Sequence, residues 1–370
     1  MSAYRGRTTV AAAALSLVMG VSLAACGDSG DSGGPGGTTS AGDGFKVGLL
    51  FSQNVQPRWE NFDKPLIEKK IKELCADCTM EYANAKGDVA TQQQQVETMI
   101  NRDVEVLLLS AVNFRSLRFS VERAHDAGIP VIAYDGLVEG PIAAHVSFDN
   151  ERVGRLQAEA LLRALGDRAA SSQIVMMNGP QTSPTNVAFK KGALSVLQGR
   201  VRIGKGYDTP GWSQETAHSN MESAIAALGV NSIDGVYAAN DGLAAGVISA
   251  LKAAGIRPLP PVTGQDADLA AVQRIVLGEQ YMSVYKPFKA EADAAAEMAV
   301  ALGRGEDLDA LADTTVDTAT TKDIPAVLLD PIPVTVDDIR STVIKDGAYT
   351  VGQICTPKVA PACERAGLSG

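Results

Sequence analysis

Residues 104–111 read Val-Glu-Val-Leu-Leu-Leu-Ser-Ala. This run has the length of a strand and is almost wholly apolar, which is typical of a strand buried on both faces of a parallel sheet. Segments of helical period flank it at residues 88–102 and 114–127, the second ended by Gly128 and Pro130, and another apolar run lies at 129–135. The β–α–β spacing predicts the centre of a parallel sheet with helices on its faces.

The same alternation extends in both directions along the chain. Before the central run we expect strands at 46–52 and 80–85 and a helix at 58–74. After residues 147–149 the cycle restarts, with helices expected at 150–165, 184–197, 214–228, 241–254 and 269–277, and strands at 174–178, 202–207, 235–239, 262–264 and 281–285. Two successive doubly wound α/β halves explain this order, and the ligand of such sheets lies beyond the carboxyl ends of the strands. Polar residues stand at those ends: Asp135, Asn240, Asp241, Gln265, Asp266 and Lys286.

Length and composition agree with a protein of two globular domains. The chain has 370 residues, of which 45% are hydrophobic, enough for sizeable cores. Its 33 basic and 43 acidic residues leave a net charge of −10. This acidic balance argues against a nucleic-acid partner, which would need a positive face.

The N-terminus has the pattern of an export signal. Arg5 and Arg7 precede an apolar stretch at 10–25 that contains no acidic residue and ends directly before Cys26. The boundary looks like a bacterial lipobox, so we predict a signal peptide at 1–25, a lipidated Cys26 and a flexible tether at 26–44 rich in glycine. A plain secretory signal with a coincidental cysteine is the alternative.

The other four cysteines form two local pairs, Cys75 with Cys78 and Cys355 with Cys363. In an oxidising exterior they most simply make two disulfides with short loops. A zinc site made of all four cysteines and a redox C-x-x-C motif are the alternatives that remain open.

Catalytic and cofactor motifs are scarce, so we predict no enzyme, cofactor or metal. The three histidines are scattered, and the chain has no H-E-x-x-H, G-x-S-x-G or P-loop. Asp135 and Asp266 are conceivable as the carboxylate pair of a glycosidase, although carboxylates also bind the hydroxyls of a polyol. Trp59 and Trp212 lie in polar settings, where an indole either packs at a domain edge or stacks on a sugar ring.

Five stretches in order carry a resemblance to a known family. They are Val-Ser-Phe-Asp-Asn-Glu-Arg-Val-Gly at 146–154, Ala-Asn-Asp at 239–241, Thr-Gly-Gln-Asp-Ala-Asp-Leu at 263–269, Val-Tyr-Lys-Pro at 284–287 and Thr-Val-Ile-Lys-Asp-Gly at 342–347. From about residue 46 to 349 the chain resembles the type I periplasmic binding proteins of ABC sugar importers.

The resemblance implies two lobes that close on a sugar, joined by three hinge crossings near 147–149, 285–287 and 329–333. The first lobe would comprise residues 45–148 and 287–331, the second 149–286 and 332–354, and 355–370 would be a C-terminal extension. It assigns the ligand contacts to Arg58, Trp59, Asp135, Thr185, Trp212, Asn240, Asp266 and Lys286. Trp59 and Trp212 would then face each other from opposite lobes.

Two departures concern the ligand. Gly136 stands where xylose-binding members of the family have an arginine, and Ser183-Pro184-Thr185 stands where they have Asp-Asn-Asn. Loss of these anchors implies a larger pocket that admits a hexose, a disaccharide or a polyol.

The expected function is that of an extracytoplasmic binding protein, anchored to the cell membrane through the lipid on Cys26. It would deliver a xylose-like pentose or a related sugar to an ABC permease and its ATPase. A sugar sensor for a membrane receptor is the alternative, and an exported glycosidase is the least favoured one.

Overall fold

The computed structural model describes residues 44–368. The predicted signal peptide, Cys26 and all of the predicted tether except Gly44 lie outside the described residues. Within the described part of the chain, no helix is both long and apolar enough to cross a membrane.

The first lobe is built on a seven-stranded sheet with the order β10-β11-β5-β4-β3-β1-β2. Neighbouring strands are parallel except for the β10–β11 hairpin. The strands are β1 (Lys46–Phe51), β2 (Thr79–Asn84), β3 (Val106–Leu109), β4 (Val131–Tyr134), β5 (Ala144–Phe148), β10 (Thr314–Val316) and β11 (Ile324–Leu329).

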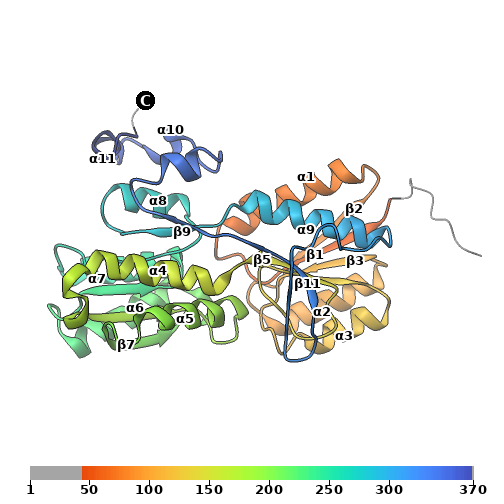
Figure 1. The fold of residues 1–370 in the computed structure, drawn as a ribbon, viewed down its shortest axis with the longest axis horizontal. Helices are drawn as coiled ribbons and strands as arrows, with labels where there is room; N and C mark the ends of the chain where they lie inside the picture. The colour runs from red at the N-terminus through yellow and green to blue at the C-terminus, as the bar shows by residue number, and fades with distance from the viewer. Residues whose placement is uncertain (1–43, 369–370) are drawn as a thin grey trace, which may run out of the picture. The chain divides into compact units, whose positions relative to one another are not determined.

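The apolar run at 104–111 forms β3 near the middle of this sheet, and both its faces are covered. Val106 and Leu108 pack in one core cluster with α1 (Lys64–Leu74) and α9 (Phe288–Gly303), which lie side by side in Figure 1. Leu107 and Leu109 pack in another with α2 (Val89–Asn101) and α3 (Arg118–Asp126). Because side chains alternate along a strand, a strand between two helix layers must be apolar at every position.

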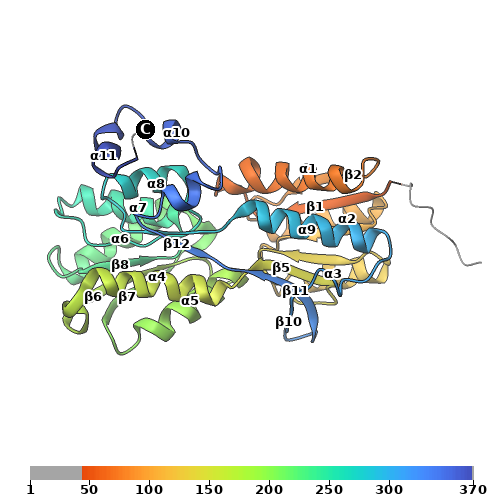
Figure 2. The same cartoon turned by 45° about the horizontal axis from the view of Figure 1, so that its top comes forward.

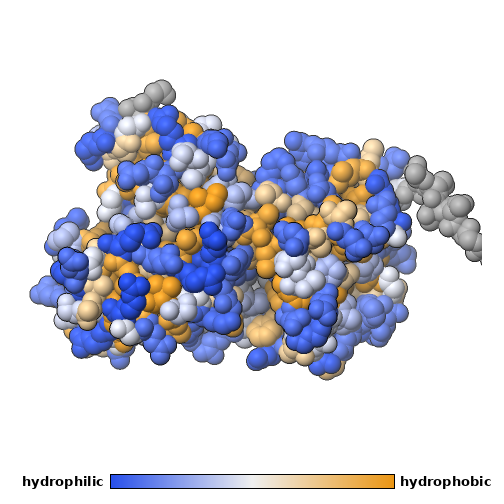
Figure 3. Space-filling view, viewed as in Figure 1, coloured by the Kyte–Doolittle hydropathy of each residue, from blue (hydrophilic) through white to orange (hydrophobic). Residues whose placement is uncertain are grey.

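The second lobe has a smaller parallel sheet with the order β7-β6-β8. Its strands are β6 (Gln173–Asn178), β7 (Arg202–Asp208) and β8 (Gly235–Ala238), and its helices are α4 (Asn150–Leu165), α5 (Pro184–Leu197), α6 (Gln214–Leu228), α7 (Asp241–Ala253) and α8 (Leu269–Val276). The strand expected at 262–264 is reduced to a single bridge between Val236 and Val262. Polar residues are interspersed over the face of both lobes drawn in Figure 3.

The chain passes between the two lobes at three places. It leaves β5 for α4 at Asp149, leaves β9 (Ser283–Tyr285) for α9 through Lys286 and Pro287, and leaves β11 for β12 (Ile332–Val334). Strands β9 and β12 pair antiparallel with each other, and Figure 2 shows the β11–β12 segment running from one lobe to the other. The predicted fold class, an α/β protein of two lobes, is confirmed.

The helix expected at 58–74 is two helices in the structure. A π-helical turn, η1 (Trp59–Asp63), precedes α1, and Lys64 N–H bonds to the Trp59 carbonyl five residues back. Pro65 has no N–H to donate into this turn, which disfavours regular α-helical bonding there. The wide turn places Trp59 and Asp63 in the interior.

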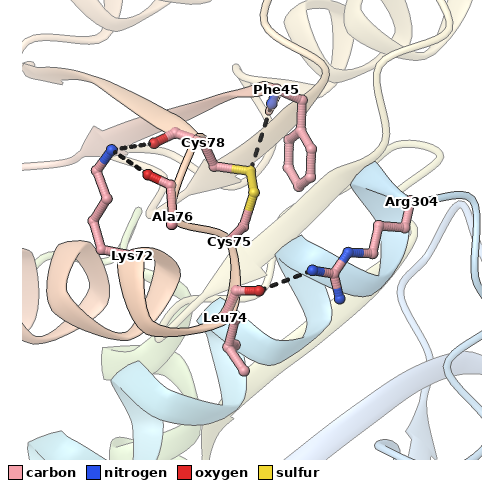
Figure 4. Close-up of a disulfide and its surroundings, with 7 residues drawn as sticks. All are labelled: Phe45, Lys72, Leu74, Cys75, Ala76, Cys78 and Arg304. Atoms are coloured by element: carbon pink, nitrogen blue, oxygen red, sulfur yellow. Dashed lines mark hydrogen bonds between the residues drawn. A yellow bond between two sulfur atoms is a disulfide. The ribbon is translucent and has the colours of Figure 1, made fainter. Parts of the chain in front are cut away.

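The structure joins Cys75 to Cys78 and Cys355 to Cys363, with Cα atoms 5.3 Å and 5.9 Å apart. Figure 4 shows the first pair at the end of α1, where Lys72 donates to the carbonyls of Cys78 (2.6 Å) and Ala76 (3.2 Å). The second pair joins Cys355, the C-cap of α10 (Val351–Ile354), to Cys363 in α11 (Ala360–Arg365). The buried side chains of α11 pack in one cluster with Val272 and Ile275 of α8. Residues 44–368 contain no cluster of three metal-ligating side chains.

Candidate functional site

All eight side chains that the sequence analysis assigned to a ligand line one cavity between the two lobes. Arg58, Trp59 and Asp135 come from the first lobe, and Thr185, Trp212, Asn240 and Asp266 from the second. Lys286 lies on the crossing after β9. The carboxyl ends of the parallel strands of each lobe therefore face this cavity, as doubly wound sheets require.

Arg58 is a deeply enclosed cation of the site, with 2% of its side chain exposed. Its Nε and Nη2 atoms donate to the two carboxylate oxygens of Asp63 at 2.9 and 2.7 Å. Nη2 also donates to Glu291 at 2.7 Å, and Nη1 donates to Asp135 at 3.1 Å. Three carboxyl groups thus hold one guanidinium in place, and its Nη1 edge points to the cavity.

Two aromatic rings complete the setting of Arg58. The guanidinium carbon lies 4.6 Å from the ring centroid of Trp59 and 4.7 Å from that of Phe288. Stacking on aromatic faces suits the planar guanidinium better than it would suit an ammonium group. The Trp59 indole in turn packs against Phe51, with ring centroids 5.0 Å apart.

Burial changes the titration of Glu291. Removal from water raises the pKa of its carboxyl to about 8, although the charge of Arg58 opposes this change. For Asp135, burial alone would raise the pKa, but Lys286 and Arg58 outweigh it and hold the pKa below its usual value. At neutral pH the cluster therefore combines a mostly protonated Glu291 with an ionised Asp135.

Lys286 connects the two lobes. Its Nζ atom lies 3.2 Å from Asp135 Oδ1 in the first lobe and 3.4 Å from Asp266 Oδ1 in the second. Arg58 Nη1 lies 3.9 Å from the same Asp266 oxygen. Side chains of opposite charge from the two lobes are thus in contact across the cleft. Asp63 and Glu291 add two further carboxyl groups, which contact Arg58.

Asn240 and Asp266 are positioned by the ends of their own elements. Asn240 caps α7 through its Oδ1, which accepts from Leu243 N–H at 2.9 Å, so its Nδ2 is left to face the cavity. The neighbouring Asp241 accepts from Gln280, from Ser283 and from the amide of Asp268, and burial raises its pKa to about 7. These bonds secure the loop that carries Asp266.

Three of the eight residues lie in the left-handed backbone region. The φ angles are +58° for Asp135, +55° for Trp212 and +97° for Asp266. Such angles are uncommon for residues other than glycine and cost on the order of 1–3 kcal/mol each. They persist where the surroundings impose them: Asp135 N–H donates to Val146 and Asp266 N–H donates to Val284, both at 2.9 Å. Part of the backbone strain of the described residues is therefore located at the cavity.

The indole of Trp212 lies on the backbone of Gly179. A Cβ atom added to Gly179 would stand 2.4 Å from the Trp212 ring. Phe189 supports the indole from the side, with ring centroids 6.5 Å apart. Both tryptophans line the cavity, and their direct opposition across a ligand stays a prediction.

Several buried polar atoms of the cavity find no hydrogen-bond partner among residues 44–368. The donors are Trp59 Nε1 and Asn240 Nδ2, and the acceptors are Gln265 Oε1 and Asp266 Oδ1. Asp266 Oδ1 lies near two cations, but not in hydrogen-bond geometry. Buried polar groups are normally paired, so this mixture suits a ligand that both donates and accepts. Hydroxyl groups do both.

Sequence reasoning missed part of the site. Gln53 and Gln56 line the cavity directly after β1, and the rule that polar residues follow strand ends was sufficient to find them. Glu291 and Asp63 hold Arg58 from within helices. No motif marks Glu291, because it is 233 residues away from Arg58 in the chain.

A family model described as a periplasmic binding protein domain matches residues 47–307. The D-xylose-binding periplasmic protein of Escherichia coli is 38% identical over 315 residues, covering 84% of this chain and 92% of that protein. The xylitol-binding protein of Mycolicibacterium smegmatis is 27% identical over 335 residues, covering 89% and 88%. A solute-binding protein of an ABC transporter from Clostridium phytofermentans, solved with bound β-D-glucose, superposes with a TM-score of 0.77 at 29% identity, covering 84% and 99%.

Proposed function

The chain belongs to the periplasmic binding protein family, and from this and the geometry of the cavity we propose that it captures one sugar between its lobes and delivers it to an ABC importer. Its relatives are binding proteins of sugar transport, and the chain is not an enzyme. The glycosidase alternative is therefore dropped. Asp135 and Asp266 instead have the role of hydrogen-bonding hydroxyl groups.

The observation that carries the proposal is the mixed set of unpaired donors and acceptors, enclosed with two indoles in one buried cavity. A sugar ring offers apolar faces to the indoles and a rim of hydroxyls to the polar atoms. Burial increases the contribution of each such hydrogen bond to the free energy of binding, because an unsatisfied polar group in the interior costs about 1–3 kcal/mol. We assign the ligand contacts to Arg58, Trp59, Asp135, Thr185, Trp212, Asn240, Asp266 and Lys286.

Closure of the two lobes is the proposed mechanism. The lobes comprise residues 45–148 with 287–331 and residues 149–286 with 332–354, and the three crossings act as the hinge. The sugar stabilises the closed state because it contacts both lobes only there, and the permease recognises that state.

Titration of the exported chain with sugars tests the proposal. We expect D-xylose, D-glucose or xylitol to change the tryptophan fluorescence saturably, because Trp59 and Trp212 both line the cavity. A charged amino acid of similar size serves as the negative control. If no sugar or polyol of a broad panel binds saturably, the proposal is wrong.

We also propose that the protein is exported, lipidated at Cys26 and held at the cell membrane, with both cysteine pairs oxidised. Cys26→Ser would remove the acceptor of the lipid, so we expect the variant in the soluble fraction and the wild-type protein in the membrane fraction. Intact mass before and after alkylation reports the disulfides. Equal partitioning of the two proteins would contradict lipidation.

A further inference from the structure

Gly136 and Pro184 meet across the cleft. Gly136 follows Asp135 at the end of β4 in the first lobe, and Pro184 is the first residue of α5 in the second. A Cβ atom added to Gly136 would stand 2.8 Å from Pro184 Cγ and 3.7 Å from its Cδ. Carbon atoms do not approach so closely, so position 136 accepts only glycine while the lobes hold this arrangement.

Pro184 cannot move away from this contact by itself. Its ring fixes the backbone φ angle, and Ser183 caps the helix that begins with it, accepting from Asn186 N–H. Helix α5 lies against α4 with almost no clearance, since a Cβ on Gly154 would stand 2.0 Å from the Phe189 carbonyl oxygen. A Cβ on Gly192 would stand 1.9 Å from the Glu151 carbonyl oxygen. Relief of a clash at Gly136 would therefore have to come from separation of the lobes.

Both residues of the contact also line the cavity. Gly136, Pro184 and Thr185 form its wall on one side, and Lys286 with its two carboxylate partners closes the gap between the lobes elsewhere. The missing side chain at 136 implied a larger pocket at the sequence level. In the structure the proline ring takes up that room, and Ser183 and Thr185, whose hydroxyls lie 2.9 Å apart, are both buried.

We propose that Gly136 and Pro184 act together as a size stop for the ligand: their contact is made when the lobes close, and it limits the cavity to a single sugar ring or a short polyol. A disaccharide would have to keep the two residues apart and so prevent closure. This inference rests on the proposed function, since it concerns the same cavity.

A double-mutant cycle tests the contact. The four proteins are the wild type, Gly136→Ala, Pro184→Ala and the double variant, each titrated with the monosaccharide that the wild type binds and with maltose. We expect Gly136→Ala to weaken monosaccharide binding at least tenfold, and Pro184→Ala to weaken it clearly less than Gly136→Ala does. Because Pro184→Ala removes the atoms that the new Cβ would meet, the double variant is expected to bind within about threefold of Pro184→Ala. Wild-type protein is expected not to bind maltose.

Two glycines serve as controls. A Cβ on Gly352 would meet nothing within 4 Å in the described part of the chain, so Gly352→Ala should bind like the wild type. Gly179→Ala creates a clash with Trp212 inside the second lobe, so its binding defect should not be relieved by Pro184→Ala.

The midpoint of thermal unfolding without ligand separates an effect on closure from an effect on folding. For Gly136→Ala this midpoint should stay within about 2 °C of the wild type, because open lobes relieve the clash.

The outcomes are distinguishable. If the wild type binds a monosaccharide but Gly136→Ala binds it equally well, or if Pro184→Ala fails to restore binding, the contact does not govern closure and the inference is wrong. Wild-type binding of maltose as tight as that of the monosaccharide would overturn the size stop alone. Absence of any sugar binding to the wild type would overturn the proposed function and the inference with it.

Discussion

Replacing Arg58 with methionine is expected to lower the free energy of unfolding by about 3–5 kcal/mol, the cost of removing one partner from a buried charge cluster. Asp63 and Glu291 are fully buried, and both direct their carboxyl groups at the guanidinium. Without it both carboxyl groups lose the adjacent positive charge and the hydrogen bonds from Arg58, and Asp63 keeps the hydrogen bond from the Tyr134 hydroxyl. Urea unfolding of the ligand-free protein at pH 7 measures the effect.

Two variants serve as comparisons for Arg58→Met. Arg102→Met removes an exposed ion pair with Glu81, at 2.6 Å, and should change the free energy of unfolding by less than about 1 kcal/mol. Glu291→Gln should cost much less than Arg58→Met, because the pKa of about 8 leaves Glu291 mostly protonated at pH 7 and glutamine keeps an acceptor for Arg58. If Arg58→Met and Arg102→Met were equally stable, the cluster would not act as a unit.

Replacing Trp212 with alanine is expected to weaken sugar binding by about 2 kcal/mol or more, which is roughly 30-fold, as for a buried tryptophan anchor of an interface. Its indole lies between Gly179 and the cavity, so truncation removes one apolar face of the site. The left-handed backbone at φ +55° is no harder for alanine than for tryptophan. Calorimetric titration is the suitable measurement, because the substitution removes one of the two fluorophores.

Trp212→Phe is the matched variant and should keep part of the affinity. The ligand-free stability of Trp212→Ala should fall by less than that of Arg58→Met, since Trp212 is only partly buried and belongs to no charge cluster. Unchanged affinity in Trp212→Ala would show that the indole only packs at the edge of the lobe.

Local signals in the chain were sufficient for most helix starts. Helices α4, α5 and α6 begin where the sequence places Asp149, Ser183 and Ser213, and each of these side chains accepts a hydrogen bond from the third residue beyond it. Such caps act within one turn and are visible in the sequence. The helix at 114–127 was predicted to begin too early: α3 starts at Arg118, because Asn113 makes a turn by accepting from the amides of Arg115 and Ser116.

The sequence by itself determined the alternation of buried strands and helices, and with it the edge at which polar side chains gather. All eight candidate residues lie at one cavity because parallel strands end on the same side of a sheet. The tertiary structure alone decided what surrounds them. Glu291 reaches Arg58 across 233 residues of chain, and Pro184 fills the room beside Gly136. Contacts between the lobes depend on packing between residues that are far apart in the chain, which no local pattern records. The proline ring that lies beside Gly136 is one such contact.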